Sequence, residues 1–390
     1  MGIEGQLTID ITCDARQVQR VDISSTRPVR IAAMFQGKAP DQALAAIPLL
    51  YSICAKAQCS AAAQAYEQAA GHEVAAGSGP AREMIVLAET AREHVLRIAL
   101  DWPGLLGAPG AGLDAKAVMG LPDKMAAVLF EQGAAFAPGA RPAIDKGAAR
   151  RLIDAFENFL ERELFGQPAA DWLERTQVDS VNMWAEAGET LPARLIGAVM
   201  ARGWARAGGA PVDALADMSA DDFAGCFVPG GQIRVPSTWE AAGETSCLTR
   251  QYDQALIRNL CETYGNGLLT RLTARLLELA RLPGEWRALL AKAEEPGGAA
   301  VQAAGANVPG CGAGAVEAAR GRLIHLMTLD RGVVADYHIL APTEWNFHPR
   351  GPAAKCLACL PGADAAELKA LAGLVITAID PCVGYQVRVH

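Results

Sequence analysis

Two stretches near the N-terminus alternate apolar and polar residues, which is the pattern of half-buried β-strands. They are residues 6–12 (QLTIDIT) and residues 17–23 (QVQRVDI), separated by a short turn at 14–16. The alternation predicts a β-hairpin in an N-terminal region that spans residues 1–36.

From about residue 40 the apolar positions follow a helical period, in Ala-rich segments that mostly end at Gly or Pro. The segments predicted to be helical are 40–71, 80–101, 147–166, 190–207, 249–261 and 265–281. Together they predict a helical bundle over residues 37–292.

The C-terminal part returns to shorter elements. Residues 293–314 are rich in Gly and Ala and predict a flexible connector. The region 315–390 follows it. Its predicted elements are a second hairpin of 322–329 and 333–340, a polar loop at 341–362 and a helix near 364–372. We expect one integrated unit over residues 1–390, mainly α-helical (α+β), with small antiparallel β elements near both termini.

The charge balance narrows the possible partners. Lys and Arg number 35 against 43 Asp and Glu, which gives a formal net charge of −8. A broad phosphate-binding surface is therefore not expected, and neither is nucleic-acid binding. The N-terminus lacks the apolar region of a secretory signal, and no apolar run is long enough to span a membrane. We expect a cytoplasmic protein without a membrane partner, whose cysteines are reduced thiols.

Familiar catalytic motifs are absent from the sequence, which contains no Walker loop, HExxH or GxSxG and no GxGxxG that opens a helix after a strand. Cys356 and Cys359 form the only CxxC pair. One such pair is a weak signal for zinc or redox chemistry, and two small apolar residues in a loop or helix start are the simpler interpretation.

Segments at both ends of the chain are more informative. They are GIEGQLTIDI at 2–11, GKAPDQALAAIPLLYSIC at 37–54, EAARGRLIH at 317–325, APTEWNFHPRG at 341–351 and IDPCVGYQVRVH at 379–390. In this order they resemble the large subunit of nickel-iron hydrogenases, whose metal site is built from a CxxC near the N-terminus and a DPCxxC at the C-terminus. The resemblance implies a large-subunit-like helical bundle.

The chain departs from that family at half of the metal ligands. Cys54 matches the second cysteine of the first pair, and Tyr51 stands where the first would be. Cys382 matches the first cysteine of DPCxxC, and Tyr385 replaces the second. Tyrosine is a poor ligand for nickel compared with thiolate. Ala32 also replaces the proton-transfer glutamate of the active enzymes, so we expect neither nickel nor hydrogenase catalysis.

Residues that surround the iron in that family are retained. Arg320, Thr343 and Asp380 match positions that lie over the metal site or hydrogen-bond the cyanides. Asp101 loosely resembles an aspartate near the site, and a role at a helix end or in solvent is its alternative. This combination looks like the hydrogenase assembly proteins of the HupK/HoxV type. The resemblance implies that Cys54 and Cys382 hold an iron unit with cyanide and carbon monoxide ligands, Fe(CN)2(CO).

In that interpretation Tyr51 and Tyr385 fill the vacated nickel volume and hydrogen-bond through their hydroxyls, rather than bind metal. The implied partners are a maturation chaperone that donates the iron unit and an immature hydrogenase large subunit that receives it. Two alternatives remain. One is a metal-free large-subunit paralogue that acts as an interaction or regulatory protein. The other is a relative of the quinone-site subunit of respiratory complex I, against which the retained Cys54 and Cys382 argue.

Overall fold

The computed structural model describes residues 5–14, 17–27, 31–105, 113–131, 135–218, 222, 242–295, 301–302, 309–362 and 364–390. The first three positions of the segment 2–11, and half of the expected connector 293–314, lie outside the described residues.

The N-terminal hairpin predicted from alternation is confirmed. Strands β1 (Gln6–Cys13) and β2 (Val18–Ser25) pair antiparallel, with Ile9 opposite Ile23. A third strand, β8 (Gly384–Val389), pairs with β1 in parallel, which the sequence analysis did not foresee. Local alternation cannot reveal this pairing, because its two strands come from opposite ends of the chain. The sheet therefore fixes the C-terminal tail directly to the N-terminal strand.

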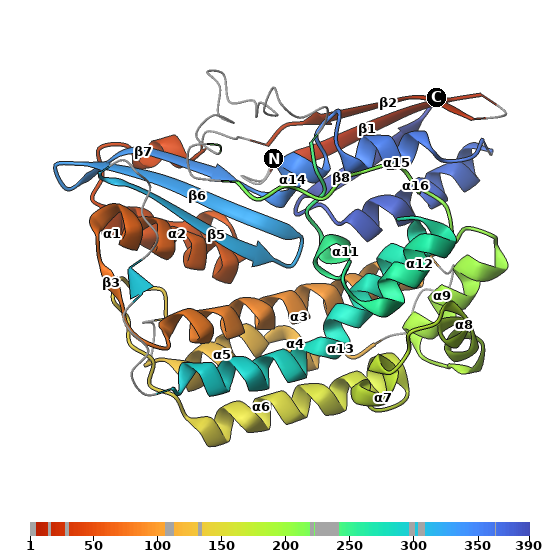
Figure 1. Ribbon diagram of the computed structural model, residues 1–390. Coiled ribbons are helices and arrows are strands. Elements are labelled where there is room, and N and C mark those ends of the chain that lie inside the picture. The colour runs from red at the N-terminus through yellow and green to blue at the C-terminus, as the bar shows by residue number, and fades with distance from the viewer. Residues whose placement is uncertain are drawn as a thin grey trace.

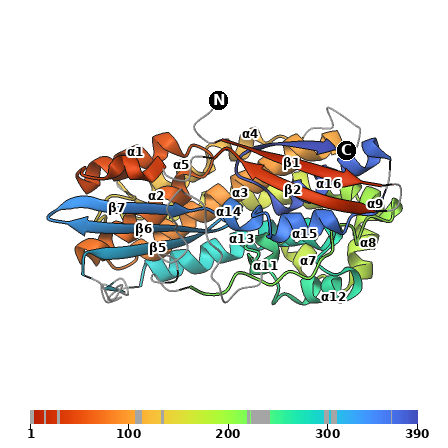
Figure 2. The same cartoon turned by 90° about the horizontal axis from the view of Figure 1, so that it is seen from above.

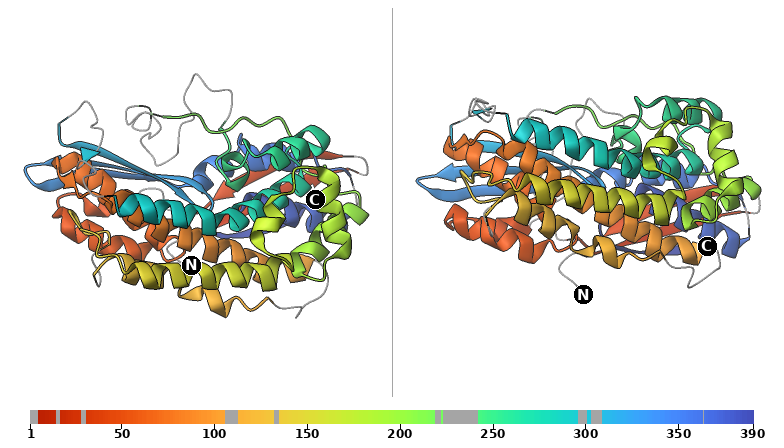
Figure 3. Two further views of the ribbon diagram at one scale, coloured as in Figure 1. Left: turned by 60° about the horizontal axis from the view of Figure 1, so that its bottom comes forward. Right: turned by 90° about the horizontal axis from the view of Figure 1, so that it is seen from below.

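The predicted bundle is present. Its elements are α1 (Pro40–Leu50), α2 (Ala55–Ala70), α3 (Ser78–Leu105), α4 (Lys116–Met119), α5 (Leu121–Leu129), α6 (Lys146–Phe159) with a π-helical continuation (Leu160–Phe165), α7 (Ala169–Leu173), α8 (Val178–Ala187), α9 (Leu191–Ala201), α11 (Cys247–Arg250), α12 (Ala255–Tyr264) and α13 (Leu268–Ala293). The long helices α3 and α13 run together through the middle of the molecule, with α6 on their outer side (Figure 1). Views from below show the same arrangement (Figure 3).

A second sheet has the order β5 (Cys311–Ala318), β6 (Gly321–Asp330) and β7 (Val333–Leu340), all antiparallel. The hairpin β6–β7 is as predicted, whereas β5 begins inside the segment expected to be a connector. Its glycines serve close packing at that point. A Cβ on Gly312 or Gly314 would overlap the backbone of α2, which lies directly on this sheet. A two-residue ladder joins β3 (Glu73–Val74) to β4 (Val301–Gln302).

The stretch 341–362, expected to be a polar loop, contains two short helices, α14 (Pro342–Asn346) and α15 (Pro352–Ala358). The predicted helix near 364–372 is longer than expected, because α16 spans Ala365–Ile379. Seen from above, α14 lies between the two three-stranded sheets (Figure 2).

The described residues form two main hydrophobic clusters. The larger one joins the long helices with α16 and the β1–β2–β8 sheet, and Cys382 belongs to it. The smaller one lies between α1, α2 and the second sheet, and Cys54 and Tyr51 pack against its edge. The two cysteines singled out from the sequence are therefore attached to different clusters. Among the helices that the structure describes, none is long and apolar enough to cross a bilayer.

Candidate functional site

Cys54 occupies the N-cap position of α2, directly before its first turn. The side chain of Glu89, on α3, accepts hydrogen bonds from the backbone N–H groups of Lys56 and Ala57, each at 3.0 Å. These two groups have no partner inside the helix, so Glu89 supplies the cap that Cys54 does not. Arg92, also on α3, donates to the carbonyl of Ile53 at 3.0 Å. Helix α3 therefore fixes the backbone on both sides of Cys54.

The sulfur of Cys54 has one hydrogen-bond donor among the described side chains, the Nε2 of Gln58 at 3.7 Å. Burial raises the pKa of the Cys54 thiol to about 12, and the nearby Cys382 contributes in the same direction. The guanidinium groups of Arg320 and Arg27 oppose this rise. Two cysteines from opposite ends of the sequence thus share one electrostatic environment.

Cys382 lies between the end of α16 and the start of β8, and it is only 8% exposed. Its backbone N–H donates to the Thr343 hydroxyl at 3.1 Å, and that hydroxyl donates to the Cys382 sulfur at 2.9 Å. Arg27 Nη1 donates to the same sulfur at 3.1 Å and also forms an ion pair with Glu344 at 3.1 Å. The structure therefore places Thr343 directly on Cys382 and adds Arg27, a residue that sequence reasoning missed.

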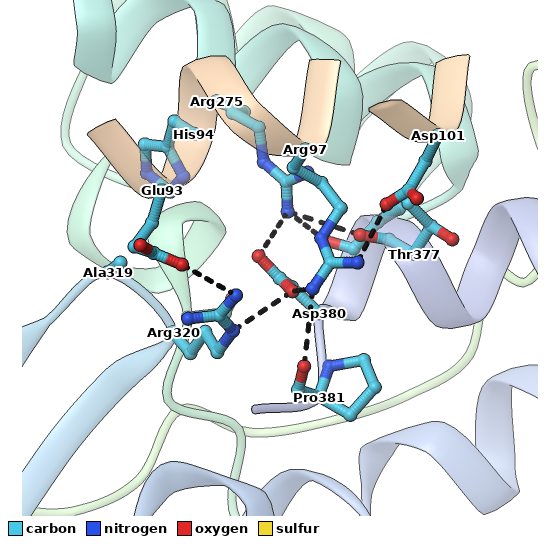
Figure 4. A network of polar contacts seen from close by, with 12 residues as sticks. Glu93, His94, Arg97, Asp101, Arg275, Ala319, Arg320, Thr377, Asp380 and Pro381 are labelled. Atoms are coloured by element: carbon cyan, nitrogen blue, oxygen red, sulfur yellow. Dashed lines mark hydrogen bonds and ion pairs between the residues drawn. The ribbon is translucent and has the colours of Figure 1, made fainter. Parts of the chain in front are cut away.

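Asp380 is the centre of a buried network of arginines (Figure 4). Its carboxylate pairs with Arg97 at 2.7 Å, Arg320 at 3.1 Å and Arg275 at 3.3 Å. Burial alone would raise the pKa of this carboxyl, but the three guanidinium groups hold it well below its usual range. Its backbone is left-handed, with φ of 73°, and Arg97 also donates to the carbonyl of Pro381 at 3.4 Å. Asp380 therefore sets the path of the tail that leads to Cys382.

Arg320 lies between this network and the thiols. Its Nε donates to Asp380, and its Nη2 donates to Glu93 of α3 at 3.1 Å. Its Nη1 is buried without a hydrogen-bond partner among the described residues. Burial lowers the pKa of Arg320, and the charges of the nearby Cys382 and Cys54 raise it. A buried donor without a partner beside two thiols fits a ligand that carries a hydrogen-bond acceptor.

The structure separates the two tyrosines. Tyr51 shares its electrostatic surroundings with Arg27, Cys54 and Cys382, and burial together with those thiols raises its pKa while Arg27 lowers it. The hydroxyl of Tyr385 instead lies 3.2 Å from the Thr377 hydroxyl of α16. No interaction between Tyr385 and either thiol is found in the described part of the chain. Tyr51 is therefore at the site, and Tyr385 packs against α16 beside it.

Asp101 belongs to the outer part of the arginine network. Its carboxylate pairs with Arg97 at 2.7 Å, one helical turn away on α3, and its side chain is 33% exposed. It acts on the site only through Arg97, which in turn binds Asp380 (Figure 4).

The CxxC pair lies apart from these groups. Cys356 is buried in α15, where Arg271 Nη2 lies 3.4 Å from its sulfur, and Cys359 is exposed at the end of that helix. Within the described ranges, no three His, Cys, Asp or Glu side chains come together as a metal site. The CxxC pair therefore has no further ligand there.

Sequence reasoning missed Arg27, Glu89, Glu93 and Glu344. Arg27, Glu89 and Glu93 lie in no local motif, and Glu344 lies in the segment 341–351 without having been singled out. Each matters because another segment, remote in sequence, supplies its partner. Glu89, Glu93 and Arg97 recur at the four-residue spacing of one helix face, which is the only local signal that could have grouped some of them.

The comparisons with solved structures define the class of fold. The Ni-Fe-Se hydrogenase from Desulfovibrio vulgaris Hildenborough, in its as-isolated oxidized state, superposes with a TM-score of 0.68 at 16% identity. The match covers 95% of this chain and 94% of that chain. Residues 265–387 also match the nickel-dependent hydrogenase family. The fold is therefore that of a hydrogenase large subunit.

Full-length relatives define the family more narrowly. The hydrogenase expression/formation protein HupK of Azotobacter vinelandii is 30% identical over 99% of this chain and 98% of its own length. The corresponding protein HoxV of Cupriavidus necator is 30% identical over 100% of this chain and 96% of its own length. The chain belongs to the HupK/HoxV family of hydrogenase expression/formation proteins.

Proposed function

We propose that this protein is a scaffold for assembly of the nickel-iron cofactor, which holds an Fe(CN)2(CO) unit between Cys54 and Cys382 and passes it to an immature hydrogenase large subunit. The iron unit is cargo, and nickel is not part of it. The observation that carries the proposal is the convergence of both thiols with Arg320, whose Nη1 lacks a partner among the described residues.

The donor set suits this cargo better than a bare metal ion. Two thiolates would leave most positions of an iron ion open, and the described residues offer no third conventional ligand. Two cyanides and one carbonyl would fill three of these positions without any further protein ligand. The free Nη1 of Arg320 can donate a charge-assisted hydrogen bond to a cyanide nitrogen.

The charges of the site support binding of two thiolates. Both thiols must lose their protons on binding iron, and burial opposes this for Cys54. Arg27 and Arg320 lie where they stabilise the resulting negative charge. We expect the chain to work as a carrier rather than as a hydrogenase, because Tyr51 and Tyr385 leave it without the remaining nickel thiolates. Its donor would be a maturation chaperone in the cytoplasm.

Anaerobic purification, metal analysis and infrared spectroscopy test the proposal. We expect about one iron per chain, essentially no nickel, and bands of metal-bound cyanide and carbonyl. Cys54→Ala should abolish these bands, whereas Cys59→Ala, one turn further along α2, should keep them. Equal nickel and iron, or bands that survive Cys54→Ala, would show that the proposal is wrong. A well-folded protein without iron or bands would favour the metal-free interaction protein.

A further inference from the structure

A buried chain of polar side chains leads away from Cys54 into the second sheet. Gln58 Oε1 lies 2.8 Å from His325 Nε2, and His325 Nδ1 lies 2.8 Å from the Tyr337 hydroxyl. Gln58 and His325 are fully buried, and Tyr337 is 2% exposed. The chain joins α2 to the neighbouring strands β6 and β7, and its first member is the residue that donates to the Cys54 sulfur.

The hydrogens of this chain can point in two directions. In the first, Tyr337 donates to His325 Nδ1, His325 Nε2–H donates to Gln58 Oε1, and Gln58 donates its amide N–H to Cys54. In the second, His325 Nδ1–H donates to the Tyr337 oxygen, and the Gln58 amide is turned over so that its oxygen faces the sulfur. A phenol carries one donor, and a neutral imidazole carries one donor and one acceptor.

Counting donors decides between the two directions. In the first direction the Tyr337 O–H, the His325 Nε2–H and one N–H of the Gln58 amide each donate to the next group. The second leaves the Tyr337 O–H without an acceptor among the described hydrogen bonds. A buried donor without an acceptor costs about 1–3 kcal/mol. Burial also lowers the pKa of His325 to about 3, so the ring is neutral near pH 7.

We propose that Tyr337 and His325 are positioning residues that lock the Gln58 amide with its N–H group toward Cys54, so that this sulfur receives a fixed hydrogen bond when it binds iron. The part that concerns iron rests on the proposed function. A hydrogen bond to a thiolate withdraws electron density from the sulfur and hence from the metal. Back-donation to carbon monoxide then falls, and the carbonyl stretching frequency rises.

Nitrogen-15 NMR of the cargo-free protein tests the orientation without any iron. We expect the His325 ring to carry its proton on Nε2. In Tyr337→Phe the donor to Nδ1 is lost, and we expect a mixture of the two ring tautomers. Tyr66→Phe is the matched control, because Tyr66 also packs against the smaller cluster, and the ring should then keep the wild-type tautomer.

Infrared spectra of the loaded protein test the consequence for the cargo. Tyr337→Phe should bind as much iron as the wild type, with the carbonyl band shifted to lower frequency, and Tyr66→Phe should leave the band in place. A wild-type ring protonated on Nδ1, or coincident carbonyl bands in Tyr337→Phe and wild type, overturns the inference. If the wild type binds no iron unit, the proposed function fails, and the ring tautomer still decides the orientation of Gln58.

Discussion

Cys54 and Cys382 are held in place by different kinds of structure. Cys54 precedes α2, an Ala-rich helix that packs closely on Gly312 and Gly314 of β5. Cys382 lies in the short link between α16 and β8, where Thr343, Arg27 and the Asp380 network hold it. Helix packing, together with backbone hydrogen bonds from Glu89 and Arg92, positions Cys54, whereas polar side chains hold the sulfur of Cys382.

This difference suits a carrier. A packed helix resists displacement, because moving it exposes apolar surface and opens cavities. The hydrogen bonds to the Cys382 sulfur can exchange partners, and a short link between two elements opens at lower cost than a packed helix. We expect Cys54 to be the permanent attachment point for the iron unit and Cys382 to be the ligand that releases it.

The largest predicted effect comes from removing the charge of Asp380. Asp380→Asn keeps the shape and tolerates the left-handed backbone, but it leaves three buried guanidinium groups without their common carboxylate. We expect a loss of about 3–5 kcal/mol in the free energy of unfolding. Thermal unfolding measures it. Asp330→Asn, at the exposed end of β6, is the control, and equal melting temperatures for the two variants would contradict the role of Asp380.

The pH dependence of stability tests the surroundings of Cys54, because His325 belongs to the buried polar chain that begins at Gln58. Because burial lowers its pKa to about 3, the unfolded chain binds more protons than the folded chain between that value and about 6.5. Stability should therefore fall as the pH falls through this window, by up to about 3 kcal/mol near pH 4.5. Glu89, whose pKa burial raises to about 7, works in the opposite direction over part of the same range.

Comparison with His325→Gln isolates the histidine term. We expect the melting temperature of this variant to fall less than that of the wild type between about pH 7 and about pH 4.5. His72→Gln, at an exposed position, should follow the wild type. An acid response in His325→Gln as steep as in the wild type would contradict the assignment. Because the pKa of Asp380 is lowered, the stability that its carboxylate gives to the fold is lost only at more acidic pH.

Arg27→Lys tests whether polar contacts keep the C-terminal segment around Cys382 in place. A planar guanidinium reaches both the Cys382 sulfur and Glu344, whereas an ammonium group is a single point of charge. We expect a loss of about 2 kcal/mol in stability and weaker retention of iron during gel filtration. Arg20→Lys, exposed on the same hairpin, is the control. Retention of iron equal to that of Arg20→Lys would show that Arg27 does not hold the tail.

Thr343→Val should have the smallest effect, about 1 kcal/mol. It removes the hydroxyl that accepts from the Cys382 N–H and donates to the Cys382 sulfur, with little change in volume. Hydrogen exchange at the Cys382 amide should become faster. Thr328→Val is the matched control, since the Thr328 hydroxyl donates to a different thiol, that of Cys311, at 3.9 Å. Unchanged exchange at the Cys382 amide would show that Thr343 does not hold Cys382 in place.

Elements that depend on local periodicity could be predicted from the sequence, and so could the two cysteines, which lie in recognisable motifs. Both hairpins and the long helices follow from the spacing of apolar residues. The pairing of β8 with β1, and the use of Gly312 and Gly314 as contact points, depend on segments remote in sequence. Thr343 was singled out from the sequence, but Arg27, the other residue that donates to the Cys382 sulfur, was missed for the same reason, because nothing near it in the sequence marks it as a neighbour of the tail.

X-ray absorption at the iron edge tests most directly whether one iron unit bridges the two differently held cysteines. We expect two sulfur neighbours of iron in the anaerobically isolated wild type. We expect fewer sulfur neighbours, and faster loss of iron, in Cys382→Ser, and no bound unit in Cys54→Ser. Iron without sulfur neighbours in the wild type, or a wild-type sulfur signal that persists in Cys382→Ser, would contradict a shared attachment to both cysteines.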